Sequence, residues 1–267
     1  ITAWERAGFN LGDTIVSIRG SSFTNGKKNA FWHYNPFYNM TEFSSFHMTQ
    51  ENLPKYVKKI KEISPKFIHG YPSAIALLAR YLHQNDEKIK GIKAILPASE
   101  TIYPGQRNLI EHVFDARLFS FYGQAEKVIM AAECEHSSNY HTFPEYGFTE
   151  VLDKENNPVA PGKRGRLIGT GFLNYCMPFI RYDTNDYATL IGDHCECGRY
   201  STILTDLKGR SSEDYVVVNE HHLISMTSIY HIIHSESFDN IFHFQFIQKR
   251  QGELILKIEP STHFSRS

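Results

Sequence analysis

The sequence predicts an α/β protein: a parallel sheet with helices, then a β-rich subdomain, then the start of a small α+β domain. Up to about residue 121, helices with apolar residues three and four apart alternate with short apolar strands. Beyond about residue 143 the segments are short, strand-like and separated by turns containing Gly, Pro and Asn. The expected domains are therefore residues 1–207, with the β-rich part at about 143–207, and residues 208–267.

In the first part, strands alternate with helices, which is the pattern of a parallel sheet with right-handed crossovers. The strands are expected at residues 13–19, 66–69, 92–96 and 117–121. In open sheets of this kind, ligands bind beyond the carboxyl ends of the strands. Three loops are expected there, at residues 70–73, 98–101 and 122–126.

Three helices separate these strands. Thr49 is the expected N-cap of the first helix, which ends before Pro65. Ser73 is the expected N-cap of the second helix, and the third helix covers residues 105–114. In each helix the apolar residues share one face, so that face should pack on the sheet.

In the later parts, alternating apolar residues and turn residues predict mostly strands. Strands are expected at residues 147–152, 165–171, 186–191 and 215–218, a helix at 225–235, and a hairpin from 241–248 and 253–258.

Composition excludes several classes of protein. Of 267 residues, 41% are hydrophobic and 21% charged, so the chain can bury a core. A net charge of −1 gives no overall attraction to nucleic acid or to an anionic membrane. No apolar run reaches the ~20 residues that span a bilayer. A cytoplasmic protein is expected, and the oligomeric state is left open.

The cysteines and the chain ends add two expectations. Four cysteines do not make a disulfide scaffold, and Cys176, in an apolar stretch, is expected in the core. The chain begins at Ile1 and stops at Ser267, so a fragment truncated at both ends is expected.

The loop at residues 122–126 combines an aromatic ring, a glycine and an acid. Tyr122 could lie against an adenine, and Glu126 could hold a Mg²⁺ that bridges phosphates. Gly123 would let the backbone approach a ligand closely. An ordinary strand-to-helix turn is the alternative.

Two further stretches carry charged groups that suit a nucleotide. Asp183 and Asp186 follow the apolar residues 177–180, which are expected to be buried. A carboxylate there can accept two hydrogen bonds from a ribose diol. A turn with local aspartate hydrogen bonds is the alternative. Arg210 follows Gly209 at the expected domain boundary, where it could reach a ligand from a hinge or belong to a solvated linker.

Together these stretches resemble the adenylate-forming superfamily of acyl-CoA synthetases. The branch they are most similar to is the phenylacetate–CoA ligase-like proteins, including the type found in capsular polysaccharide biosynthesis. The stretches that carry the resemblance are, in order, residues 70–73, 99–104, 106–107, 122–126, 145–147, 165–186 and 209–210.

The resemblance implies a role for each matching residue around a nucleotide. Tyr122 would stack on adenine, with Gly123 and Gln124 beside it in the cofactor site. Glu126 would bind Mg²⁺ and act in catalysis. Asp186 would hold the ribose hydroxyls.

The remaining matches complete the implied site. Arg210 would contact the ribose or phosphate and act in catalysis. Ser99 and Glu100 would line the adenine pocket, and Tyr71 and Pro72 would wall the pocket for the carboxylate.

The resemblance implies an AMP-forming acid–thiol ligase. A carboxylic acid and ATP would give an acyl-adenylate and pyrophosphate, and the acyl group would then pass to a thiol, expected to be coenzyme A. The acid is left open: an aryl acid such as phenylacetate, or a small or sugar-linked acyl group.

Departures from the family pattern define the alternatives. Ala125 replaces a hydroxyl residue and Asn185 replaces a glycine. The upstream phosphate loop and the catalytic lysine of such enzymes do not occur in these 267 residues, so this polypeptide alone is expected to be inactive. The alternatives are a nucleotide-binding relative without catalysis and a zinc-stapled interaction module.

Three cysteines suit a structural zinc site. Cys195 and Cys197 form a tight pair, and Cys134 lies about 60 residues earlier. The spacing leaves His136 and His141 open as the fourth ligand, and the resemblance favours His141. The alternative is three unpaired cysteines.

Overall fold

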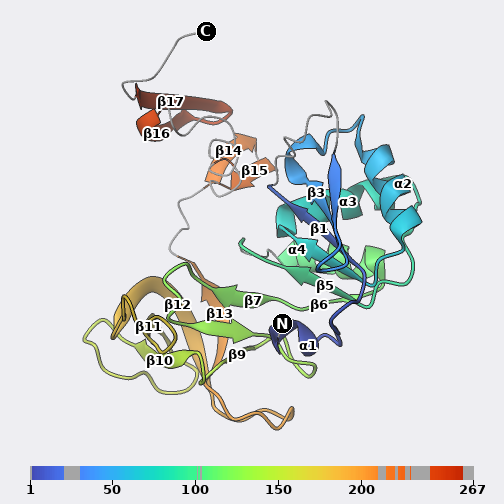
Figure 1. The fold of residues 1–267 in the computed structure, drawn as a ribbon. Coiled ribbons are helices and arrows are strands. Elements are labelled where there is room, and N and C mark those ends of the chain that lie inside the picture. The colour runs from blue at the N-terminus through green and yellow to red at the C-terminus, as the bar shows by residue number, and fades with distance from the viewer. Residues whose placement is uncertain are drawn as a thin grey trace.

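The computed structural model describes residues 2–20, 31–100, 102, 104–209, 215–219, 222–225, 229 and 241–260. Its main elements are a six-stranded mixed sheet with helices and a seven-stranded antiparallel sheet, which confirms the predicted α/β fold (Figure 1).

Five neighbouring strands of the first sheet are parallel, as predicted. The sheet order is β2-β3-β1-β4-β5-β6, and only β2 joins antiparallel, at one edge. The strands are β1 (Ile15–Arg19), β2 (Trp32–Asn35), β3 (Met40–Ser44), β4 (Phe67–Gly70), β5 (Ala94–Pro97) and β6 (Arg117–Leu118).

The predicted helices pack their apolar faces against the sheet. They are α2 (Leu53–Ile63), α3 (Pro72–Gln84) and α4 (Pro104–Phe114). The main core lies between these helices and one sheet face, with Ile18 and Ile68 fully buried. The short helix α1 (Thr2–Glu5) and the residues after it cover part of the opposite face, where Phe9 packs on Phe67. The rest of that face borders a cavity described below.

Both predicted N-caps are wrong by a few residues. Thr49 lies in a turn, where its carbonyl accepts hydrogen bonds from the amides of Asn52 and Leu53, and Asn52 is the N-cap of α2. The N-cap of α3 is Tyr71, because Pro72 starts the helix at a position where its fixed φ is favourable.

The antiparallel sheet begins at Phe121, earlier than the β-rich part expected from about residue 143. Its order is β10-β11-β12-β13-β9-β8-β7. The strands are β7 (Phe121–Gly123), β8 (Met130–Ala132), β9 (Tyr140–Thr142), β10 (Gly147–Leu152), β11 (Arg164–Gly171), β12 (Tyr182–Gly192) and β13 (Ile203–Lys208). The single strand predicted at 117–121 is therefore wrong: it divides into β6 of one sheet and β7 of the other.

The apolar stretch between β11 and β12 is exposed, so its predicted burial is wrong. Tyr175 is 88% exposed and Ile180 is 75% exposed. Cys176, expected in the core, is exposed as well. The reason is that the stretch is a loop beyond the paired ends of the strands, so its apolar side chains do not share one buried face.

Two hairpins follow the antiparallel sheet. The first is β14 (Tyr215–Asn219) with β15 (His222–Ser225), and the second is β16 (Ile241–Arg250) with β17 (Glu253–Pro260), which turns at Gly252 as predicted. The helix predicted at 225–235 lies almost entirely outside the described residues. Among the described helices, none is long and apolar enough to cross a membrane.

Candidate functional site

Tyr122 and Asp186, which are 64 residues apart in the sequence, touch in the structure. The Tyr122 hydroxyl donates a hydrogen bond to Oδ2 of Asp186 at 2.5 Å. Tyr122 is the central residue of β7, at one edge of the antiparallel sheet, and Asp186 lies in β12. Two residues that the sequence predicted for one site are thus brought together.

Hydrogen bonds of the backbone hold Asp186 in place. The backbone amide of Asp186 donates a hydrogen bond to the Thr184 hydroxyl, and that hydroxyl donates one to the Leu167 carbonyl of the neighbouring strand. Asn185 adopts a left-handed conformation with φ of 58°. Asparagine tolerates this conformation better than most residues, which explains how it can stand where the family pattern has glycine. Asp186 itself is 6% exposed.

The turn after β7 carries two more predicted residues. Glu126 accepts a hydrogen bond from the Tyr182 hydroxyl at 2.8 Å, so its carboxylate is tied to the strand that carries Asp186. The side-chain nitrogen and oxygen of Gln124 are both buried, and neither has a hydrogen-bond partner among the described residues. Buried amides are rarely left unpaired, so Gln124 is suited to meet a ligand with a donor and an acceptor.

The chain after β13 passes directly beside Asp186. A Cβ atom added to Gly209 would lie 3.9 Å from Oδ1 of Asp186. Arg210, the next residue, lies outside the described residues, so its predicted role stays a prediction.

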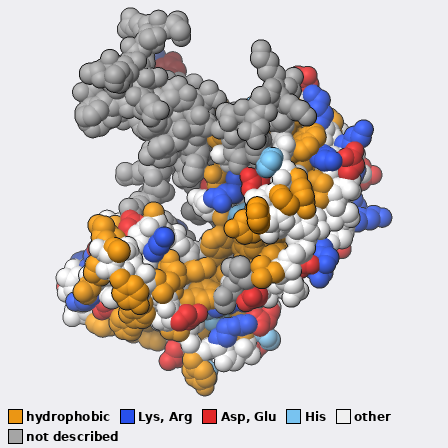
Figure 2. All heavy atoms as spheres, in the orientation of Figure 1, with side chains coloured by type: hydrophobic (Ala, Val, Ile, Leu, Met, Phe, Trp, Pro, Cys, Tyr) orange, Lys and Arg blue, Asp and Glu red, His pale blue; other side chains and the backbone are white. Residues whose placement is uncertain are grey.

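A cavity of about 900 Å³ lies on the open face of the mixed sheet. Figure 2 shows hydrophobic side chains gathered in the hollow between the two parts of the molecule. Tyr71 and Ser99, both predicted for the site, line this cavity, and so does Phe121. Phe121 and Tyr122 are consecutive in a strand, so their side chains point to opposite faces. The cavity and the Tyr122–Asp186 pair therefore flank the same short strand.

Two other predicted residues have structural partners. The carboxylate of Glu100 accepts hydrogen bonds from the amide and hydroxyl of Ser73 at 3.0 and 3.1 Å, which satisfies the first turn of α3. Pro72 is buried at the start of that helix. Neither is among the residues that line the cavity.

Sequence reasoning missed four polar residues of the cavity: Ser17, Arg19, Glu42 and His69. Each lies in a short strand next to an apolar residue. That position is the only signal in the sequence, because the sheet face on which each lies depends on the pairing of distant strands.

The predicted cysteine cluster is assembled with His141 and without His136. The ligand atoms of Cys134, His141, Cys195 and Cys197 all lie within 4.8 Å of one another. The Cys134 and Cys195 sulfurs are 3.9 Å apart, far beyond a disulfide bond and close to the roughly 3.8 Å separation of two thiolates on a tetrahedral Zn²⁺. Burial lowers the pKa of His141, which favours the neutral imidazole that binds metal.

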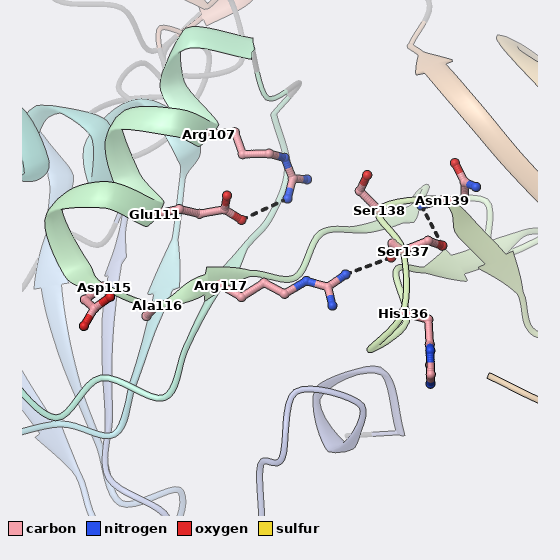
Figure 3. A pocket seen from close by; sticks show the side chains of 9 residues that line it. All are labelled: Arg107, Glu111, Asp115, Ala116, Arg117, His136, Ser137, Ser138 and Asn139. Atoms are coloured by element: carbon pink, nitrogen blue, oxygen red, sulfur yellow. Dashed lines mark hydrogen bonds and ion pairs between the residues drawn. The ribbon is translucent and has the colours of Figure 1, made fainter. Parts of the chain in front are cut away.

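Two arginines of the α/β part contact the loop that carries Cys134 and the residue before it. Arg117 of β6 donates hydrogen bonds to the carbonyls of Cys134, Glu135 and Ser137, and Figure 3 shows it extended toward this loop. Arg107 of α4 forms an ion pair with Glu133, the residue before Cys134. The two arginines therefore join the α/β part to the antiparallel sheet beside the cysteine cluster.

Glu133 is the most deeply buried acid of this junction, with no exposed side-chain surface. Burial raises the pKa of Glu133 to about 7, and the positive charge of Arg107 opposes the rise. Arg107 lies in the stretch that carried the family resemblance, and here it braces the two sheets.

Comparison with curated proteins finds one clear sequence relative. Protein CapK of Staphylococcus aureus is 29% identical over 192 residues, which cover 70% of this chain and 40% of that protein. No family model matches the chain.

Solved structures share the fold at lower identity. A 2-hydroxyisobutyryl-CoA ligase in the postadenylation state superposes with a TM-score of 0.63 at 21% identity, over 97% of this chain and 56% of the ligase. A Brucella canis acyl-CoA synthetase and Mycobacterium smegmatis MbtA each superpose with a TM-score of 0.53, at 17% and 12% identity, over 99% of this chain and 51% of each structure.

The comparisons confirm the resemblance found from the motifs. The chain has the fold of the adenylate-forming acyl-CoA ligases, and its sequence is similar to protein CapK. It spans 40% of the length of the curated relative and little more than half of the solved ligase.

Proposed function

We propose that this chain binds ATP and a small carboxylic acid, and that the full-length gene product activates the acid as an acyl-adenylate and transfers it to coenzyme A. The observation that carries the proposal is the contact between Tyr122 and Asp186, with Gly209 beside the same carboxylate. Three separate stretches of the sequence meet there, which supports a site that encloses one nucleotide.

The chemistry of the donor set fits an adenosine nucleotide. Asp186 offers carboxylate oxygens to the ribose hydroxyls, and the Tyr122 ring offers an aromatic face to adenine. The buried amide of Gln124 can pair with the donor and acceptor of a base edge. Glu126 would hold Mg²⁺, whose charge neutralises the phosphate oxygens when it is bound.

The activation step follows from the weakness of carboxylates as electrophiles. An oxygen of the acid attacks the α-phosphorus of ATP, and the bond from that phosphorus to pyrophosphate breaks. The resulting mixed anhydride carries AMP as a good leaving group, which a thiolate of coenzyme A then displaces. Negative charge accumulates on the oxygens of the α-phosphate, so the cations that this site would hold would supply the main stabilisation.

The names of the relatives support this scheme. The 2-hydroxyisobutyryl-CoA ligase structures hold an acyl-AMP, and two of them hold CoA as well. The curated relative is a Cap protein, which agrees with a role in capsular polysaccharide biosynthesis.

Nucleotide binding by this chain tests the site. In Asp186→Asn we expect the dissociation constant for Mg·ATP or AMP to rise by about 10- to 100-fold, since the ribose loses a charged acceptor worth about 1.5–3 kcal/mol. Isothermal titration calorimetry measures it. Asp183→Asn is the matched control, because Asp183 pairs with Arg166 instead of Tyr122. Equal affinities in the two variants would contradict the assignment of Asp186.

Pyrophosphate exchange by the full-length gene product separates the reaction from its alternatives. Exchange into ATP that depends on a carboxylate supports the ligase. ATP binding without exchange supports a nucleotide-binding relative that has lost catalysis, for which Ala125 is the best argument. The absence of both supports a zinc-stapled interaction module.

We also propose that Cys134, His141, Cys195 and Cys197 hold one structural Zn²⁺. All four residues would be ligands, so no coordination position would be left for substrate. The purified protein is expected to contain about one zinc per chain by mass spectrometry of metals. Cys197→Ser should reduce that content and lower the melting temperature, whereas Cys176→Ser, at an exposed cysteine outside the cluster, should change neither. A stable protein without zinc would contradict the proposal.

A further inference from the structure

A row of polar side chains crosses the floor of the 900 Å³ cavity. Ser17 of β1 is in register with Glu42 of β3 on one side and with His69 of β4 on the other. Adjacent strands are about 4.8 Å apart, so Glu42 and His69 are separated by about 10 Å at the backbone, with Ser17 between them. All three residues line the cavity.

His69 presents a hydrogen-bond acceptor to this cavity. Its Nδ1 lies 2.7 Å from the Leu96 carbonyl, which can only accept, so Nδ1 carries the proton. Burial lowers the pKa of His69 to about 4, so the ring is neutral and Nε2 keeps its lone pair. Nε2 has no hydrogen-bond partner among the described residues, and His69 lines the cavity although it is only 6% exposed.

Glu42 is a second acceptor in the same row. No hydrogen bond or ion pair joins its carboxylate to any described residue. A purely apolar occupant that displaces water from these two acceptors is unfavourable, because each desolvated acceptor left unpaired costs about 1–3 kcal/mol.

A cation lies at the end of the cavity toward the carboxyl ends of the strands. Arg19 is two residues beyond Ser17 on the same face of β1, about 6–7 Å along the strand. Its guanidinium lies 3.5 Å from the Ser99 hydroxyl and over the Tyr71 ring, and no described carboxylate forms an ion pair with it. It is therefore placed to receive the carboxylate of a ligand.

Aromatic rings form much of the remaining wall. Trp4, Phe9, Tyr71 and Phe121 line the cavity, and the Trp4 ring lies 4.9 Å from the His69 ring. Flat apolar surfaces favour a planar ligand, while the acceptors on the floor require that ligand to donate hydrogen bonds.

We propose that this cavity selects an aromatic carboxylic acid that carries a hydroxyl group. The carboxylate lies at Arg19 and Ser99, and the hydroxyl donates a hydrogen bond to His69 or Glu42. The inference rests on the proposed function in that the acid bound here is the one to be activated, and it makes His69 and Glu42 specificity-determining residues for that acid.

Matched pairs of acids test the selection by binding alone. The 2-, 3- and 4-hydroxyphenylacetic acids are compared with the three methylphenylacetic acids, which have similar shapes and no donor. With the whole chain, we expect at least one hydroxy acid to bind about tenfold more tightly than its methyl partner by isothermal titration calorimetry. No measurable binding of any acid, or equal affinities within all three pairs, would overturn the inference.

Variants locate the acceptor. The hydroxyl preference should fall below about twofold in His69→Phe or in Glu42→Leu, and it should persist in His112→Phe, the same replacement at an exposed histidine of α4 that does not line the cavity. Glu42 is only half-buried, so its variant remains informative if His69→Phe fails to fold. Preference retained in both cavity variants would overturn the assignment.

The outcome is independent of the test of the proposed reaction. A hydroxyl preference without carboxylate-dependent pyrophosphate exchange would uphold the cavity and contradict the ligase. Carboxylate-dependent pyrophosphate exchange without a hydroxyl preference would support the ligase and contradict the inference about the cavity.

Discussion

Replacing Gly70 with alanine is expected to lower the free energy of unfolding by about 3–5 kcal/mol, from backbone strain and overpacking together. Gly70 ends β4 with φ of +149°, and an added Cβ would lie 2.2 Å from the Ile18 carbonyl oxygen of the neighbouring strand. That oxygen accepts the Tyr71 amide hydrogen bond, so the clash falls where the chain enters the cavity.

Urea unfolding followed by circular dichroism measures the loss. Gly105→Ala is the matched control, because this glycine lies in α4 with a negative φ and no atom within 4 Å of an added Cβ. The control should be neutral or more stable by up to about 1 kcal/mol. A Gly70→Ala protein as stable as the control would show that the β1–β4 spacing is not fixed as described.

Replacing Arg107 with methionine should cost about 3–5 kcal/mol of unfolding free energy, because it leaves the Glu133 carboxylate buried without its cation. The double variant Arg107→Met/Glu133→Gln should recover much of this loss, since the uncompensated charge is gone. Lys59→Met, which breaks an exposed ion pair with Glu62, should cost less than about 1 kcal/mol.

The loss in Arg107→Met should depend on pH. Burial raises the pKa of Glu133 in the folded protein to about 7 from an ordinary value of 4.5, so its contribution to stability is full below pH 4.5 and declines as the pH rises toward 7. Without Arg107 the folded pKa rises further, and the decline continues above pH 7. The stability gap from the wild type should therefore be wider at pH 8.5 than at pH 6, and a gap that is constant or narrower at pH 8.5 would contradict this explanation.

The sequence predicted those parts of the fold that local patterns determine. Leu53, Tyr56, Val57 and Ile60 lie at helical spacing, and all four are buried in α2. By contrast, the residues from 117 to 123 read as one strand, although they serve two sheets. A strand of two or three residues carries too little pattern to reveal which distant strands it pairs with.

Sequence motifs predicted some residues of the candidate site. Other residues could not be predicted, because their place in the site depends on how distant strands pair. The motifs led to Tyr122 and Asp186, which the structure joins. The choice of His141 over His136 depends on the pairing of His141 with Ile203, which spacing alone cannot give. His69 was hidden because a histidine in an apolar strand shows its role only when its neighbour Leu96 and the cavity are known.

The junction between the two sheets limits how the molecule can be divided. Only Phe119 and Ser120 separate the last residue of β6 from the first residue of β7. Phe119 packs against the core of one sheet, while the Ser120 hydroxyl accepts a hydrogen bond from Tyr140 of the other. Because no linker separates the two sheets, a cut or insertion at this point would disrupt the packing of Phe119 and the hydrogen bond of Ser120 together. Neither half is then expected to be recovered as an independent piece, and reassembly would require the two to be present together.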